Sequence, residues 1–495
     1  MNKWMQLHSS DHVAVALHPL QAGEELTING NTVLVKEDIK QGHKISLIEL
    51  NEHSPVIKYG YPIGHATKPI KQGEWIHTHN LKTNLDAEEA YTFHQELRPN
   101  PYALKNLSFQ GYRRKNGKVG IRNDLFIVPT VGCVNGVAEQ TINLFKERNQ
   151  DLTGIDNISV LKHPYGCSQL GDDHVNTRTI LKNMTKHPNA AGVLVFGLGC
   201  ENNTIQEFKK AIGQYDDERI KFLIAQEHED EIEAGVKLLE EIFTVAKLDA
   251  REEIPLSELK IGLKCGGSDG FSGITANPLL GVFSDFLISQ GGTTILTEVP
   301  EMFGAERILM SRAKDEVVFH KIVTLINDFK AYFLSNGESV YENPSPGNKD
   351  GGISTLEDKS LGCIQKAGTS TVVDVLKYGE TISEKGLNLL QAPGNDLVAT
   401  TALAAAECHM VLFTTGRGTP FGGFVPTIKV ASNTDLFTRK NNWMDFDAGQ
   451  LLTKPMDAVL DEFISYLIGV ANGNFTKNER NNIREVAIFK TGVTL

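Results

Sequence analysis

Short hydrophobic runs between glycine-rich turns fill the first 85 residues of the chain. Runs at 13–17, 32–35, 56–59 and 74–76 predict strands, and no helical period interrupts them. Glycines stand between the runs, where turns need residues without a side chain. Residues 1–85 are therefore predicted to form a small β-rich domain. Residues 86–105 are polar and end in Pro99 and Pro101, which predicts a linker or a strap along the surface.

From residue 106 to 250, hydrophobic runs of strand length alternate with amphipathic stretches of helix length. Predicted strands are 125–131, 158–162, 192–198 and 219–225, and predicted helices are 134–148, 175–186, 205–212 and 230–245. Alternation at these lengths is typical of a parallel sheet covered by helices.

Residues 251–495 repeat this alternation on a larger scale. Predicted strands are 260–264, 293–297, 371–376, 387–390, 409–413, 427–431 and 486–490, and predicted helices are 278–289, 316–334, 397–405 and 455–470. The pattern as a whole predicts an α/β protein. A small β-rich domain comes first, and two Rossmann-like parallel-sheet regions follow it, at 106–250 and 251–495.

Composition narrows the range of functions. The net charge of −12 offers no broad basic surface for nucleic acid or for an anionic membrane. The longest apolar stretch, near 190–198, is too short to span a bilayer, and residues 1–8 lack the apolar region of a secretory signal. Six cysteines without a CxxC pair indicate free thiols in a reducing cytoplasm.

Several common catalytic motifs are absent from the sequence. There is no GxxxxGK[ST] loop, no GxSxG and no HExxH, and the glycines at 197 and 199 are followed by Asn202 where a dinucleotide motif needs glycine. A nicotinamide enzyme is therefore disfavoured.

Three cysteines follow predicted strands of the first α/β region. Cys133, Cys167 and Cys200 each come directly after a glycine in the loop that leaves a strand. Ligands bind at the carboxyl ends of parallel strands, and thiolates favour iron, iron–sulfur clusters or zinc. The alternative is that these are small buried residues at tight turns. Cys265 follows a strand of the second region in the same way.

The N-terminal domain carries a pair of histidines, His77 and His79. On a strand, residues two apart point to one face, so this pair could bind a metal ion. Further histidines in the same domain are His8, His12, His43 and His65. The alternative is a polar strand face with solvated histidines.

Three glycine-rich polar loops, at 265–277, 343–352 and 414–423, offer backbone N–H groups to an anion. Arg417 or Lys349 could hold a carboxylate there. The alternative is that the loops are ordinary tight turns.

Glu298 and Glu301, at the end of a predicted strand, could bind a metal ion or transfer protons. The alternative is that they are solvated at the start of a helix.

Together these stretches resemble the altronate and galactarate dehydratase family. The segments that carry the resemblance are 165–174 (YGCSQLGDDH), 197–203 (GLGCENN), 265–270 (CGGSDG), 272–278 (SGITANP), 343–352 (NPSPGNKDGG) and 413–423 (FTTGRGTPFGG). The resemblance implies an N-terminal SAF (β-clip) domain and a metal-dependent hydro-lyase. It also implies loss of water from D-altronate, giving 2-keto-3-deoxy-D-gluconate in galacturonate breakdown.

The resemblance also guides the choice of site residues. It implies ferrous iron, with manganese as a possible helper, and an iron–sulfur cluster stays open. The metal site is expected either at His77 and His79 or at Cys133, Cys167 and Cys200. Expected proton-transfer residues are His43, Asp269 and Lys366, and expected substrate-binding residues are Ser268, Ser345, Asn348, Lys349 and Arg417.

Two other functions remain possible from the sequence alone. One is a lyase for a related acid, such as galactarate or a sulfonated acid, and the other is a sugar-acid-binding protein without catalysis. A small-molecule sugar acid is the expected partner, and a homodimer is the expected assembly.

Overall fold

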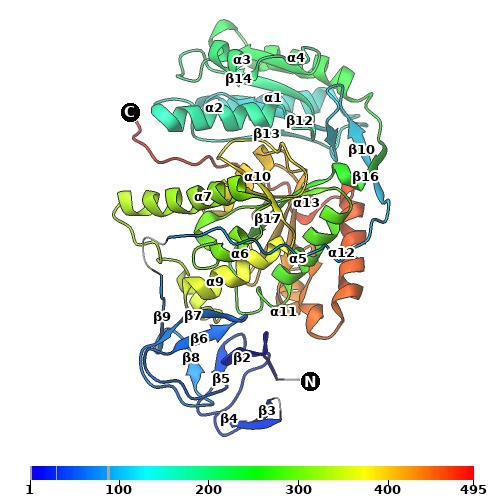
Figure 1. The fold of residues 1–495 in the computed structure, drawn as a ribbon. Coiled ribbons are helices and arrows are strands. Elements are labelled where there is room, and N and C mark those ends of the chain that lie inside the picture. Colours follow the sequence, from blue (N-terminus) through cyan, green and yellow to red (C-terminus); the bar gives the residue numbers. More distant parts are fainter. Residues whose placement is uncertain (1–2, 29, 86–89) are drawn as a thin grey trace.

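A computed structural model describes residues 3–28, 30–85 and 90–495 of the chain. The N-terminal β domain lies at one end, a seven-stranded sheet with its helices lies in the middle, and a four-stranded sheet lies at the other end (Figure 1). This arrangement confirms the predicted α/β class with a β-rich N-terminal domain. Within the predicted linker at 86–105, residues 86–89 lie outside the described residues.

The N-terminal domain consists of short antiparallel strands. They are β1 (Trp4–Met5), β2 (Val13–Ala16), β3 (Glu25–Ile28), β4 (Asn31–Leu34), β5 (Lys44–Ser46), β6 (Pro55–Lys58), β7 (Tyr61–Ala66), β8 (Trp75–Ile76) and β9 (Leu81–Lys82). They pair in the orders β1-β2-β5-β8, β3-β4 and β6-β7-β9. Ala14, Ala16 and Ile45 are fully buried in the centre of the domain.

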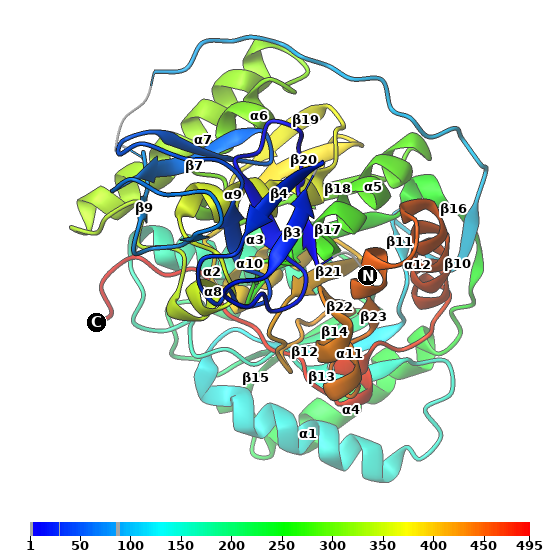
Figure 2. The ribbon, with the colours of Figure 1, turned by 90° about the horizontal axis from the view of Figure 1, so that it is seen from below.

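Residues 90–107 run as an extended segment along the C-terminal domain (Figure 2). Side chains hold the segment in place at several points. Gln95 Nε2 donates to the carbonyl of Ala313 at 3.0 Å, and Asn100 Nδ2 donates to the carbonyl of Asp285 at 2.7 Å. The segment is thus fixed to the domain that it crosses.

The middle part of the chain forms two small sheets. In the first, β10 (Ser108–Arg113) pairs antiparallel with β11 (Val119–Gly120) and β16 (Glu252–Pro255), strands that the hydrophobic pattern did not predict. The second sheet is parallel, in the order β13 (Asn157–Val160), β12 (Asp124–Pro129), β14 (Ala190–Gly197), β15 (Ile220–Ile224). Helices α1 (Asn135–Arg148) and α4 (Glu231–Ala246) cover one face, and α2 (Gly171–Thr185) and α3 (Ile205–Ile212) cover the other.

The C-terminal part is built on a parallel sheet in the order β19-β20-β18-β17-β21-β22-β23. The strands are β17 (Lys260–Cys265), β18 (Thr293–Leu296), β19 (Val372–Leu376), β20 (Leu387–Leu390), β21 (Met410–Thr415), β22 (Thr427–Ala431) and β23 (Phe446–Asp447). Its helices are α5 (Ala276–Ser289), α6 (Glu306–Met310), α7 (Glu316–Ser335), α8 (Pro346–Asp350), α9 (Leu356–Cys363), α10 (Asp396–Ala405), α11 (Thr434–Arg439), α12 (Met456–Ala471) and α13 (Lys477–Arg480).

The predicted strand at 486–490 is wrong. Val486 and Ile488 are buried, but the backbone of this segment bonds to side chains and pairs with no strand. Ala487 N donates to Thr401 Oγ1 at 3.2 Å, and Phe489 N donates to Tyr378 OH at 2.9 Å. Alternating apolar residues therefore record burial between two layers here, without a sheet.

One hydrophobic core joins the four-stranded sheet to the C-terminal domain. Phe126 of β12 packs edge-on against Phe424, with ring centroids 6.2 Å apart. His187 lies in this interface, where its Nε2 is 3.2 Å from the carbonyl oxygen of Cys408. In the described part of the chain, no helix has the length and apolar character needed to cross a membrane.

Candidate active site

The N-terminal domain docks on the glycine-rich loops of the C-terminal domain through the turn at Gly42. A Cβ on Gly270 would lie 2.1 Å from the carbonyl oxygen of Gly42, and one on Gly352 would lie 2.3 Å from the same oxygen. Gly270 N also donates to the carbonyl of Gly351 at 2.7 Å. The glycines of these loops therefore let three backbone segments touch, which side chains would prevent.

A buried ion cluster fixes this docking. Lys44 Nζ and Lys58 Nζ lie 2.8 and 2.9 Å from the two carboxylate oxygens of Asp358 in α9. Lys44 also donates to the carbonyl of Gly352 at 2.7 Å. Burial alone would raise the pKa of Asp358, but the two ammonium groups outweigh it and hold that pKa below its usual range.

A cleft of about 620 Å³ opens beside the Gly42 turn. Arg417, Arg439 and Lys440 line it, together with the carboxylates of Asp269 and Asp435. The Arg417 side chain is exposed and donates to the carbonyl of Gly347 at 3.3 Å. Among the described residues it pairs with no carboxylate, so its guanidinium keeps donors for an anionic ligand. The cleft supplies the local positive charge that an acidic protein needs to bind an acid.

Asp269 forms the floor of this cleft. Its Oδ1 accepts hydrogen bonds from Ser272 N, Ser272 Oγ and Ser432 Oγ, each at 2.9 Å, and its Oδ2 accepts from Asn433 Nδ2 at 3.2 Å. Burial raises the pKa of Asp269, and the four donors oppose that rise. A Cβ on Gly416 would lie 2.1 Å from Asp269 Cγ, so only glycine leaves room for the carboxylate here.

Asp269 also lines a small chamber behind the cleft. The chamber has a volume of about 10 Å³, about enough for one water molecule. Ser268, Lys58, Lys359 and Cys363 also face it. Ser268 is 2% exposed, and its Oγ has no hydrogen-bond partner among the described residues. A buried hydroxyl without a partner is costly, and it indicates a position where a ligand or water completes the site.

A buried thiol–carboxylate cluster, made of Cys265, Glu301 and Cys363, lies next to the chamber. The two Sγ atoms are 3.3 Å apart, and each is 3.1 Å from Glu301 Oε2. This cluster alone, among the described residues, brings three possible metal ligands within 4.8 Å of one another. Thiolates with a carboxylate suit ferrous iron or zinc.

Lysines surround the thiol–carboxylate cluster. Lys366 Nζ lies 2.8 Å from Cys265 Sγ, and Lys359 Nζ lies 2.8 Å from Glu301 Oε1. Lys264 and Lys366 both pair with the buried Glu298. Burial favours the neutral acid at Glu301, but the charges of Lys359, Lys264 and Lys366 prevail and place its pKa far below the usual range. Glu301 is therefore a carboxylate that can act as a ligand.

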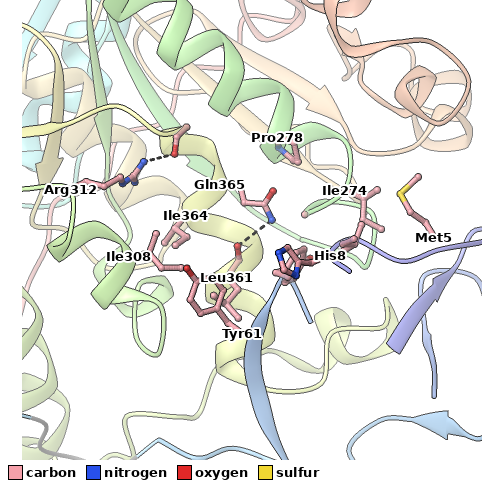
Figure 3. Close-up of a pocket in the computed structure, with 14 residues that line it drawn as sticks. Met5, His8, Tyr61, Ile274, Pro278, Ile308, Arg312, Leu361, Ile364 and Gln365 are labelled. Atoms are coloured by element: carbon pink, nitrogen blue, oxygen red, sulfur yellow. Dashed lines mark hydrogen bonds between the residues drawn. The ribbon is translucent and has the colours of Figure 1, made fainter. Parts of the chain in front are cut away.

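A further pocket, lined mainly by apolar side chains, lies beside the N-terminal domain. It has a volume of about 340 Å³ and lies between Met5, His8 and Tyr61 of the N-terminal domain and helices of the C-terminal domain (Figure 3). Its one arginine, Arg312, donates to the carbonyl of Gly368. Gln365 Nε2 donates to the carbonyl of Leu361 at 3.3 Å. Arg312 and Gln365 thus each bond to a backbone carbonyl, while Arg312 Nε has no hydrogen-bond partner among the described residues.

The whole chain matches known families in the order of its domains. Residues 2–84 match the family described as "Altronate/galactarate dehydratase SAF domain", and residues 111–247 match "D-galactarate dehydratase/Altronate hydrolase, second domain". Residues 256–494 match "D-galactarate/Altronate dehydratase, C-terminal". The chain belongs to the altronate/galactarate dehydratase family.

Curated members of this family align over nearly their whole length. The chain is 60% identical to the altronate dehydratase of Bacillus subtilis (strain 168) and 56% identical to that of Escherichia coli (strain K12), and in each case all of both chains is covered. It is 34% identical to the galactarate dehydratase (L-threo-forming) of Escherichia coli (strain K12), over 95% of this chain and 93% of that one. A dehydratase is a hydro-lyase, so the enzyme class follows from the family.

The histidines of the SAF domain lie at its interface with the C-terminal domain. His43 Nδ1 accepts from Trp75 Nε1 at 3.2 Å and its Nε2 is 3.1 Å from the carbonyl oxygen of Asp350, so both ring nitrogens are occupied. His77 Nδ1 is 3.0 Å from Ser354 Oγ, and burial lowers the pKa of His77 to about 3. Its ring is therefore neutral at physiological pH.

The predicted strand geometry at His77 and His79 is wrong. Strand β8 ends at Ile76, and His77 begins a turn in which Asn80 N donates to the carbonyl of His77 at 3.0 Å. Both imidazoles contact the ring of Trp75, whose centroid lies 5.2 Å from that of His77 and 4.9 Å from that of His79. The role of the pair as metal ligands stays a prediction.

The other predicted substrate-binding residues support the loops. Ser345 and Asn348 form a capping box at the start of α8, and Asn348 Nδ2 donates to the carbonyl of Ser268 at 2.8 Å. Lys349 follows in the same helix and is partly buried. The structure therefore brings Asp269 and Arg417 to one cleft, and Ser268 lines the small chamber behind it, supported by Asn348.

Lys366 lies in the buried cluster, away from the surface of the cleft. Glu298 and Glu301 are buried in ion pairs, so the solvated alternative considered for them is wrong. Sequence reasoning missed Cys363 and Lys359. Their spacing with Lys366, at i, i+4 and i+7, is that of one helix face and could have pointed to them, although α9 ends at Cys363 and Lys366 lies in the 3-10 turn that follows.

Proposed function

We propose that this chain is an altronate dehydratase, a hydro-lyase that converts D-altronate to 2-keto-3-deoxy-D-gluconate and water. The observation that carries the proposal is full-length identity of 60% and 56% to two curated altronate dehydratases, against 34% to a galactarate dehydratase. The cationic cleft supports it, because an aldonate carries one carboxylate. The six cysteines are all free, as expected of a cytoplasmic enzyme.

Different residues of the cleft bind the substrate and transfer its proton. Arg417 binds the carboxylate of altronate in a bidentate manner. Asp269, with its carboxylate held by four donors, accepts the proton from C2. Ser268 Oγ, which has no partner, hydrogen-bonds to a hydroxyl of the sugar chain. The C3 hydroxyl then leaves with the proton that Asp269 has taken from C2, so that water is released and the carboxylate is restored. The enol that remains tautomerises to the keto acid.

Cys265, Glu301 and Cys363 would hold the ferrous iron that the family implies, with manganese as a possible helper. The donors suit a soft divalent ion, because two Sγ atoms that are 3.3 Å apart each lie 3.1 Å from one carboxylate oxygen. When bound, the ion supplies a Lewis acid that stabilises negative charge in the reaction. Lys366 Nζ donates to Cys265 Sγ at 2.8 Å, so an ammonium group lies beside this ligand.

The test is turnover of D-altronate by protein purified without oxygen, with and without ferrous iron. Formation of 2-keto-3-deoxygluconate that depends on iron supports the proposal. Arg417→Ala is expected to lower kcat/KM by at least about 100-fold, since a charged hydrogen-bonded pair is lost. Arg148→Ala, which breaks an exposed pair with Glu233, is the matched control and should leave kcat/KM unchanged.

The same assay separates the alternatives. Turnover of galactarate and not of altronate would assign the chain to the other branch of the family. Binding of altronate without turnover, in the presence of ferrous iron or manganese, would overturn the enzymatic proposal in favour of a binding protein.

A further inference from the structure

Three of the six cysteines lie exposed at one edge of the four-stranded sheet. Free cysteine is among the most buried residue types, and Cys265, Cys363 and Cys408 follow that rule. Cys133, Cys167 and Cys200 are exposed instead. They follow β12, β13 and β14, which are adjacent and parallel, so all three leave the sheet at its carboxyl edge.

Hydrogen bonds tie the three loops to one another beside these cysteines. Gly132 N donates to the carbonyl of Tyr165 at 2.8 Å, which joins the first loop to the second. Asn203 N donates to the carbonyl of Gly166 at 3.1 Å, which joins the third loop to the second. A Cβ on Gly166 would lie 2.0 Å from the carbonyl oxygen of Thr130. The loops are thus interlocked, and each cysteine lies within three residues of a tie.

Three helices begin shortly after these cysteines. Helices α1, α2 and α3 begin at Asn135, Gly171 and Ile205, within five residues after Cys133, Cys167 and Cys200 respectively. The positive end of a helix stabilises an anionic group that lies beside it.

A buried amide at the same edge lacks a partner. Gln169 is 4% exposed, and its Oε1 accepts from Gly166 N at 3.1 Å. Its Nε2 has no hydrogen-bond partner among the described residues. This donor lies on the loop of Cys167, and donors of this kind stabilise the sulfurs of iron–sulfur clusters.

The distance between thiolates that a single metal ion needs differs from the distance that an iron–sulfur cluster needs. A single tetrahedral ion holds its thiolates about 3.8 Å apart. Throughout residues 3–28, 30–85 and 90–495, the thiol–carboxylate cluster is the one group with three ligand atoms inside 4.8 Å, so the three exposed thiols are not preformed around one ion. An iron–sulfur cluster binds each thiolate through a different iron and needs wider spacing.

We propose that Cys133, Cys167 and Cys200 bind an iron–sulfur cluster at this edge, through three of its irons. The site is separate from the proposed catalytic cleft, since the seven-stranded sheet and its helices lie between the four-stranded sheet and the SAF domain (Figure 1). It is also separate from the thiol–carboxylate cluster, which needs no sulfide.

The experiment reconstitutes the full chain with ferrous iron and sulfide without oxygen, and then measures iron, acid-labile sulfide and visible absorbance. The wild-type chain is expected to retain about four irons and four sulfides for a cubane cluster. Cys167→Ser and Cys200→Ser should each lower bound sulfide at least about tenfold. Cys408→Ser, at a buried thiol of the C-terminal domain, is the matched control and should retain the cluster.

The outcomes keep this proposal apart from the proposed function. Loss of sulfide in both variants, with unchanged far-ultraviolet circular dichroism, supports the cluster whether or not altronate is turned over. Absence of sulfide from the wild-type chain, stoichiometric zinc in its place, or a disulfide between two of the three cysteines would each overturn it. Iron-dependent turnover in a wild-type chain without sulfide would overturn the cluster and leave the dehydratase standing.

Discussion

Replacing Asp358 by asparagine should undock the SAF domain from the C-terminal domain. Asp358 is buried, and its two oxygens face Lys44 Nζ at 2.8 Å and Lys58 Nζ at 2.9 Å. The variant removes the negative charge and leaves two ammonium groups in a protein interior. Lys44 keeps the carbonyl of Gly352 as a partner, but Lys58 keeps no carboxylate among the described residues.

The expected cost follows from this geometry. Removing one partner of a buried ion pair destabilises a protein by about 3–5 kcal/mol, because the charge left behind is uncompensated. Glu462→Gln, which breaks an exposed pair with Lys454, should cost less than about 1 kcal/mol. The combined variant Lys44→Met, Asp358→Leu, Lys58→Met removes all three charges and should recover most of the loss.

Trp75 reports on this interface, because its indole donates to His43, which contacts Asp350. The assay is urea unfolding followed by Trp75 fluorescence, in a background where Trp4 and Trp443 are phenylalanine. Loss of less than about 1 kcal/mol in Asp358→Asn, equal to the surface control, would refute the reasoning that this ion cluster fixes the SAF domain.

Three further predictions concern the cleft, the metal ligands and the acid sensitivity of the domain interface. Gly416→Ala places a Cβ 2.1 Å from Asp269 Cγ, so the variant should lower the free energy of unfolding by about 1–3 kcal/mol, measured by thermal unfolding, and should also lower kcat. An unchanged kcat would show that catalysis does not require the present position of Asp269. Glu301→Gln should weaken binding of ferrous iron at least about tenfold, measured by metal content after dialysis at fixed free iron, and equal retention would exclude this carboxylate as a ligand. Burial lowers the pKa of His187 to about 4, below the value of about 6.5 in an unfolded chain, so its contribution is fully present above pH 6.5 and is lost as the pH falls towards 4. Urea unfolding should therefore show about 2 kcal/mol less stability at pH 5 than at pH 7 from this residue, and His187→Gln should flatten that part of the pH dependence; an equally steep dependence in the variant would contradict the assignment.

The sequence by itself determined the layers of this protein. Strands such as β14 and β22, and helices such as α3 and α7, were predicted to within about two residues, because periodicity records which face of an element is buried. It also placed Ser268, Asp269 and Arg417 in loops at strand ends, which is where an α/β protein binds ligands. The prediction of strands from the hydrophobic pattern failed where buried residues do not pair with another strand. Examples are Val486 and Ile488, and the turn that follows Ile76.

Only the tertiary structure decided which of these residues meet. Cys265 and Cys363 are 98 residues apart in the chain, and Lys58 and Asp358 are 300 apart, yet each pair is in contact. Such contacts depend on the order in which strands join the sheet and on how the SAF domain docks, and neither leaves a periodic signal in the sequence. The physical reason is that periodicity records only which face of a single helix or strand is buried. Which charged side chains come into contact depends on how all the elements pack together.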